Sequence, residues 1–177
     1  MCIRDSGSVY LSEAERNSLN KLSGDKKGRS ILHPYRAYAA PTEEGKAHGP
    51  LLGTAWFDTH RVRTLRETIM IVVDPSDKVK RIEVLAFAEP KGYLPKPKWF
   101  AQFVGKSLNP GLKLARDIRG VSGVSMSCRA ATSAVRRCLA SHQISAEQVA
   151  RQAREAAAKK AKRSTAKKSP TTQGSTK

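Results

Sequence analysis

Long apolar runs and paired cysteines are missing from this sequence, and acidic residues are few. No segment approaches the run of about 20 apolar residues needed to cross a bilayer, because the longest apolar segments, residues 69–73 and 84–88, have only the length of strands. The three cysteines, Cys2, Cys128 and Cys138, form no CxxC pair and no even disulfide framework. These absences argue against an integral membrane protein, a metal site and a redox disulfide.

Recognisable catalytic arrangements are also absent. No Ser-His-Asp, Cys-His or paired-carboxylate pattern is legible in the sequence. The chain has no GxGxxG motif within a strand-helix-strand unit, which disfavours dinucleotide binding by a Rossmann fold. We therefore expect no catalytic residues and no metal ligands, and the sequence favours a carrier over a self-contained enzyme.

Positive charge is abundant. The chain has 177 residues, with 33 Lys and Arg against 15 Asp and Glu, and its formal net charge is +18. Residues 145–177 contribute nine basic and two acidic side chains, so residues 1–144 are basic in their own right. Such an excess favours a polyanionic partner, either nucleic acid or an anionic membrane surface.

The chain divides into three segments by composition. Its first six residues resemble sequence that adapter read-through adds to gene models, so residues 1–10 are expected to be a non-native or disordered N-terminus. On this interpretation an export signal is missing, and the expected location is extracytoplasmic, either periplasmic or membrane-associated. Residues 11–144 have the composition of one folded domain. Residues 145–177 are predicted to begin as a helix and to become disordered beyond about Lys159.

The folded segment predicts an α+β domain in which helices flank an antiparallel sheet. Ser12 and Glu15 have the spacing of a capping box at the start of a first helix. Turn residues at 74–77 separate two apolar segments and indicate a hairpin. The predicted elements are strands near residues 31–39, 53–58, 67–73 and 78–88, and helices at residues 12–24, at 98–103 and following the turn that contains Gly123.

A turn of small and hydroxyl residues precedes the last of these helices. It consists of Ser122, Gly123, Val124, Ser125, Met126 and Ser127. A glycine-containing turn that leads into a helix presents unpaired backbone N–H groups and the positive end of the helix dipole, which suits a phosphate. A serine hydroxyl at this place can contact the phosphate or be esterified by it. An ordinary N-cap and turn is the alternative.

Four blocks of sequence occur in order between residues 53 and 142. They are GTAWFDTHRVRT at 53–64, AEP at 88–90 with YLP at 93–95, WFAQFVGK at 99–106, and IRGVSGVSMS at 118–127. Together these blocks resemble the FMN-binding domain family, which includes the small flavin-carrying subunits of sodium-pumping NADH:quinone reductases and of Rnf-type electron-transport complexes. The chain is most similar to the short stand-alone members.

The resemblance implies covalent attachment of FMN. In the family, a separate flavin transferase links FMN through a phosphoester bond to the last residue of a Ser/Thr-Gly-Ala-Thr motif. In this chain Ser122 and Gly123 match the motif, Val124 replaces Ala, and Ser125 replaces the acceptor Thr. Covalent attachment at Ser125, reversible FMN binding and an empty site therefore remain alternatives, with Ser127 as a second hydroxyl to test.

The resemblance also implies an electron-transfer role with redox partner proteins. We expect the flavin ring to lie near Glu89 and Tyr93, with Tyr93 or Trp99 covering it. The cations expected beside the ring are Arg61, Arg63 and Arg129.

The basic tail supports a different hypothesis. A lysine-rich segment of this kind binds nucleic acid or anionic lipid head groups with a strong dependence on salt. In this alternative the chain is a basic nucleic-acid- or anionic-surface-binding protein, and its flavin-like domain is degenerate and free of flavin.

Overall fold

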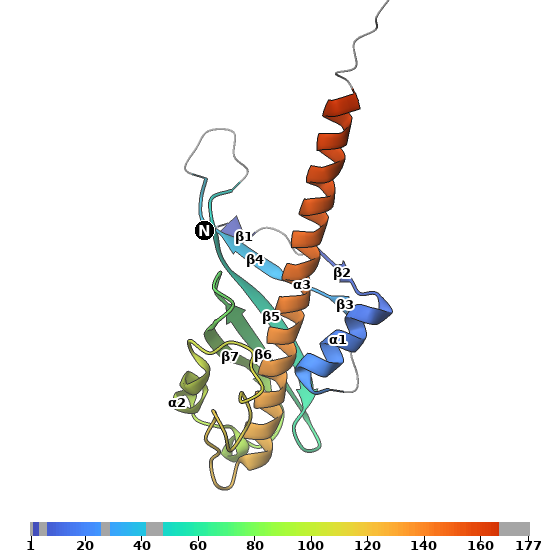
Figure 1. Cartoon of the computed structure of the whole chain (residues 1–177). Coiled ribbons are helices and arrows are strands. Elements are labelled where there is room, and N and C mark those ends of the chain that lie inside the picture. Colours follow the sequence, from blue (N-terminus) through green and yellow to red (C-terminus); the bar gives the residue numbers. More distant parts are fainter. Residues whose placement is uncertain (1, 4–6, 26–28, 42–47, 167–177) are drawn as a thin grey trace, which may run out of the picture. The chain divides into compact units, whose positions relative to one another are not determined.

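The computed structural model describes residues 2–3, 7–25, 29–41 and 48–166. The chain divides into two compact units, Met1–Ser145 and Ala146–Lys177. The first unit holds a five-stranded antiparallel sheet with the strand order β1-β4-β5-β6-β7, drawn in Figure 1. Its strands are β1 (Cys2–Ile3), β4 (Tyr35–Tyr38), β5 (Leu51–Arg61), β6 (Arg66–Val73) and β7 (Val79–Phe87). The predicted α+β class with an antiparallel sheet and flanking helices is confirmed.

The long hairpins β5–β6 and β6–β7 form the centre of the sheet. Side chains alternate along β6, so that Glu67, Ile69, Ile71 and Val73 are buried on one face, as a half-buried strand requires. The predicted turn at residues 74–77 joins β6 to β7, and the Asp74 carboxylate accepts hydrogen bonds from the backbone N–H groups of Ser76 and Lys78.

The N-terminal helix α1 (Glu13–Ser23) has the predicted ends. Ser12 and Glu15 form the reciprocal capping box, and Gly24 ends the helix in the left-handed conformation at φ 76°. The aromatic segment predicted as one helix at residues 98–103 is instead a single α-helical turn, α2 (Pro97–Phe100), followed by the 3₁₀ turn η2 (Ala101–Phe103). A further 3₁₀ turn, η1 (Lys91–Tyr93), precedes them.

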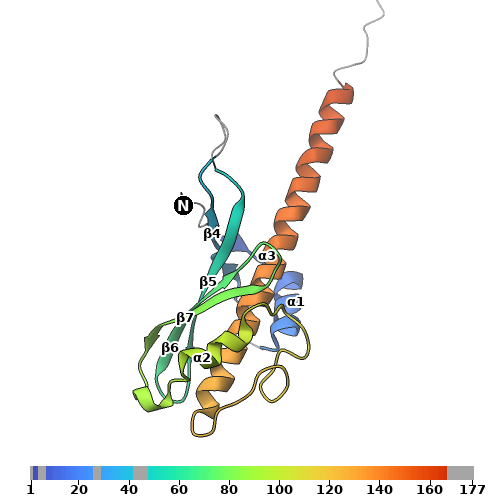
Figure 2. The same ribbon diagram turned by 90° about the vertical axis from the view of Figure 1, so that its left-hand side faces the viewer.

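The longest helix, α3 (Ser125–Ala166), continues without a break across residue 145. In the first unit its buried residues are mostly small, and they pack against the inner face of the sheet (Figures 1 and 2). They include Cys128, Ala131, Ala134, Val135, Cys138 and Leu139. Cys128 and Cys138 are therefore both buried on one helix. Within the described residues, none of the helices combines the length and apolar character that a membrane span needs.

The N-terminal segment differs in part from the prediction, whereas the tail begins as the predicted helix. Two short strands form within the segment expected to be disordered. Cys2–Ile3 pairs with β4, and β2 (Val9–Tyr10) pairs with β3 (Ile31–Leu32), because these neighbouring segments offer backbone groups for hydrogen bonding. At the other end α3 extends to Ala166. The expectation of disorder otherwise concerns residues 167–177, which lie outside the described residues.

Arg136 connects three parts of the first unit. Its guanidinium donates hydrogen bonds to the carbonyl oxygens of Leu22 and Ser23 at the end of α1. It also donates to those of Asn109 and Leu112 in the loop that leads to α3. Because helix-end and loop carbonyls need such partners when they are buried, Arg136 fixes the first turns of α3 relative to α1 and the loop.

Candidate functional site

The turn at residues 122–125 places Ser125 at the start of α3. Gly123 has φ 82°, a left-handed conformation that side chains other than glycine rarely adopt. The first bond of the helix ladder joins the Cys128 N–H to the Val124 carbonyl oxygen at 3.0 Å. The backbone N–H groups of Ser125, Met126 and Ser127 therefore precede the ladder, and the Ser125 side chain is exposed beside them.

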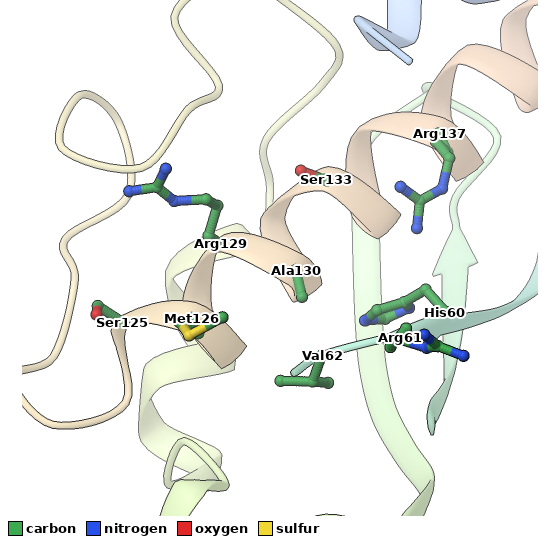
Figure 3. A pocket seen from close by; sticks show the side chains of 9 residues that line it. All are labelled: His60, Arg61, Val62, Ser125, Met126, Arg129, Ala130, Ser133 and Arg137. Atoms are coloured by element: carbon green, nitrogen blue, oxygen red, sulfur yellow. The ribbon is translucent and has the colours of Figure 1, made fainter. Parts of the chain in front are cut away.

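A cavity of about 510 Å³ runs along α3 from Ser125. It lies between one stripe of the helix and the end of β5, and its volume is within the range typical of small-molecule sites. Figure 3 shows Ser125 and Arg129 toward one end and His60 with Arg137 toward the other. The remaining lining residues are Arg61, Val62, Met126, Ala130 and Ser133.

A buried carboxylate lies behind the His60 end of this cavity. Asp58 is completely buried on the inner face of β5. The Arg137 guanidinium donates to both of its oxygens, at 2.7 and 3.0 Å, and Arg29 donates to one of them at 2.9 Å. Burial opposes ionisation of Asp58, but the hydrogen bonds from His60 and Arg137 and the charges of Arg137 and Arg29 outweigh it, so its pKa lies well below the usual range.

His60 bridges two buried carboxylates. Its Nδ1 lies 3.0 Å from Oδ1 of Asp58, and its Nε2 lies 3.0 Å from Oε2 of Glu67. Two carboxylate acceptors require a donor on each ring nitrogen, which only the imidazolium supplies. Burial opposes this charge, but the hydrogen bonds to Asp58 and Glu67 outweigh it and raise the pKa of His60 above its ordinary value.

The same unit contains a histidine with the opposite arrangement. The Trp56 indole N–H donates to Nδ1 of His142 at 3.3 Å, and Nε2 of His142 lies 3.0 Å from a carboxylate oxygen of Asp77. Since an indole can only donate, Nδ1 of His142 accepts and the ring is neutral. Burial lowers the pKa of His142, in agreement with this assignment.

Two arginines of the cavity carry uncompensated charge. Arg137 is bonded to Asp58 and to Asp25. By contrast, Arg61 and Arg129 are exposed and make no hydrogen bond or ion pair within the described part of the chain. Two unpaired guanidiniums on one cavity provide sites for an anionic ligand.

Of the predicted motif residues, the structure brings Ser125 and Met126 into this cavity, together with two of the three predicted cations, Arg61 and Arg129. Val124 and Trp99 line a second, more apolar cavity of about 680 Å³, and Val124 is not part of the lining of the first. Trp99 is buried there, and its indole N–H donates to the Arg119 carbonyl oxygen.

The other predicted residues lie elsewhere. Glu89 closes the turn between β5 and β6, because its Oε1 accepts from the backbone N–H groups of residues 63–65 at 2.7 to 3.3 Å. Tyr93 lies beneath Arg63, whose guanidinium carbon is 4.6 Å from the ring centroid. Ser122 and Gly123 are exposed in the turn, while Ser127 is buried and its hydroxyl has no hydrogen-bond partner in the described residues.

Sequence reasoning missed the Asp58, His60, Glu67 and Arg137 cluster. One signal was present, since Asp58 and His60 are two residues apart on a strand and must share a face. The sequence did not show that this face of β5 is buried near Asp58, nor that Glu67 is the register partner of His60.

The comparisons with known proteins do not assign this site to a family. No model of a protein family matches the chain, and a search of curated proteins finds no significant match.

Proposed function

We propose that this chain is an electron-transfer protein that carries FMN, attached through its phosphate to the hydroxyl of Ser125. The observation that carries the proposal is the difference between two hydroxyls of one helical turn. Ser125 is exposed at a cavity, whereas Ser127 is 1% exposed and faces the interior. A flavin transferase could reach the first hydroxyl and not the second.

The surroundings of Ser125 fit a phosphate ester. The free N–H groups of the first turn of α3 and the unpaired Arg129 supply donors and positive charge on that side of the cavity. Val62, Met126 and Ala130 supply an apolar surface between the two ends (Figure 3). When bound, FMN would supply the redox chemistry, and the residues of this chain would hold and orient it.

Intact mass measurement tests the attachment. The chain is co-expressed with a flavin transferase in an exporting host, alongside Ser125→Ala and Ser127→Ala. The expected result is a mass gain of one FMN less water, with in-gel flavin fluorescence, in the wild type and in Ser127→Ala but not in Ser125→Ala. A wild-type chain without the gain, beside a family member that is modified, would reject covalent attachment, and reversible FMN binding would then be measured directly.

A second function is supported by the charge of the other unit. Residues 149–159 of α3 are exposed, and residues 145–177 carry nine basic side chains against two acidic ones. A colourless protein that neither gains FMN nor binds it, and that binds DNA or anionic vesicles less tightly as salt increases, would favour the nucleic-acid- or anionic-surface-binding alternative.

A further inference from the structure

We propose that the cavity along α3 is an anion-binding site whose charge is set by one proton, the one that His60 holds between Asp58 and Glu67. For the identity of its natural ligand the inference rests on the proposed function. The charge balance rests only on contacts within the chain.

The buried cluster is balanced only while His60 is protonated. Asp58 and Glu67 are both completely buried and both contact His60, and the half-buried Arg137 is the second cation of the cluster. With the imidazolium in place, the positive charges of His60 and Arg137 equal the negative charges of Asp58 and Glu67, and loss of the proton leaves these four groups with one excess negative charge. At the exposed margin Arg29 contacts Asp58, and Asp25 contacts Arg137.

The two unpaired arginines then determine the net charge that an anion in the cavity experiences. Arg61 follows His60 directly on β5, and Arg129 lies two helical turns before Arg137 on α3. While His60 is protonated and the cluster is neutral, the charges of Arg61 and Arg129 are uncompensated in the described residues, and they attract an anion. When His60 loses its proton, the excess negative charge of the cluster cancels part of this attraction, so anion binding weakens.

Among the described residues, no other titratable group in contact with this cluster supplies a competing switch in the neutral range. Burial raises the pKa of the Cys128 thiol, which senses the charge of Glu67, and that of the Cys138 thiol, which senses the charge of Asp58. Both thiols therefore stay neutral. The remaining charged groups around the cluster are Arg29, Asp25, Arg61 and Arg137, of which the arginines do not titrate in this range.

The first measurement is the protonation state of His60 in the ligand-free chain. Long-range ¹H–¹⁵N NMR spectra are expected to show both ring nitrogens of His60 protonated at neutral pH and His142 as a neutral ring in the same sample. A neutral His60 at pH about 7 would overturn the inference.

The second measurement is the affinity for sulfate, which stays a dianion across the whole range. It is followed through the Nε–H signals of Arg61 and Arg129 at constant ionic strength. Affinity is expected to fall as pH rises through the titration of His60. His60→Gln is expected to weaken sulfate binding roughly fivefold at neutral pH, because the cluster then carries an excess negative charge at every pH.

A charge-restoring variant separates this role from a structural one. The double variant His60→Gln with Glu67→Gln removes one positive and one negative charge, and its sulfate affinity is expected to return to within about twofold of the wild type and to be independent of pH. Arg61→Gln should weaken binding, and Arg63→Gln, which removes a charge outside the cavity, should not. Absence of sulfate binding, or binding that His60→Gln leaves unchanged, would overturn the inference. Since none of these measurements requires flavin attachment, their outcome is independent of the mass measurement at Ser125.

Discussion

The Nε2 atom of His60 lies 3.0 Å from Oε2 of Glu67, its register partner across the β5–β6 ladder. Glu67 is completely buried, and His60 lies on the same face of the sheet, that of the buried Asp58. An antiparallel pair of this kind brings its Cβ atoms close together, so the contact follows from the register alone. The register of one hairpin thereby places a half-buried imidazole against a buried carboxylate, at the cavity that begins at Ser125.

This pairing predicts how stability depends on pH. The pKa of His60 is higher in the folded chain than in the unfolded chain, so its contribution is fully present below about pH 6.5 and is lost as pH rises through the folded value. His60→Gln should therefore lower the free energy of unfolding more at about pH 5.5 than at about pH 9.5. Urea unfolding of both proteins at the two pH values measures this. An equal loss at both would show that His60 is not charged in the folded state.

The second prediction concerns the partner of Asp58 on the helix. Arg137→Leu leaves a completely buried carboxylate without its two-pronged donor, and it should destabilise the chain by about 3–5 kcal/mol. Arg129→Leu, on the same helix but exposed and unpaired in the described residues, should change stability by less than about 0.5 kcal/mol. Denaturant unfolding compares the two. Similar effects would mean that the Asp58 contact contributes little to the folded state.

Local patterns in the sequence predicted much of the fold. The capping box at Ser12 and the hairpin at residues 74–77 were readable because each depends on residues within a few positions of one another. The sequence did not predict that α3 continues through residue 145, because a helix that continues carries no local signal comparable to a cap.

The candidate site was predictable only where it is local. The accessible hydroxyl of Ser125 belongs to a short motif, whereas the cluster around His60 unites β5, β6 and α3. Glu89 has a structural role that the sequence did not predict. The resemblance placed it near the flavin ring, and in the structure its carboxylate accepts hydrogen bonds from the backbone of a turn 24 residues or more away in sequence.

The third prediction separates these two roles of Glu89. Its carboxylate accepts three backbone N–H groups of the β5–β6 turn, and these hydrogen bonds lower its pKa. Glu89→Ala should therefore speed amide hydrogen exchange at Thr64 and Leu65, while Glu83→Ala on β7 should not. In the wild type the protection should persist above the ordinary pKa of a glutamate and decline as pH falls through the lowered value.

The FMN mass gain provides the matching control. Because Glu89 supports a turn and lies outside the lining of the Ser125 cavity, Glu89→Ala should gain FMN as the wild type does. Loss of the gain with unchanged exchange at Thr64 would instead favour contact between Glu89 and the ligand.

The fourth prediction compares two buried hydroxyls on α3. The Ser127 hydroxyl has no partner in the described residues, whereas the Thr132 hydroxyl donates to the Cys128 carbonyl oxygen at 2.7 Å. Removing an unsatisfied buried hydroxyl relieves a desolvation cost, so Ser127→Ala should leave stability unchanged or raise it by up to about 1 kcal/mol. Thr132→Val, which removes a bonded hydroxyl at nearly constant volume, should cost about 1 kcal/mol. Thermal and urea unfolding measure both changes.

A large loss of stability in Ser127→Ala would reveal a partner for that hydroxyl, such as a buried water. Ser127→Ala would then no longer be a neutral control for attachment at Ser125.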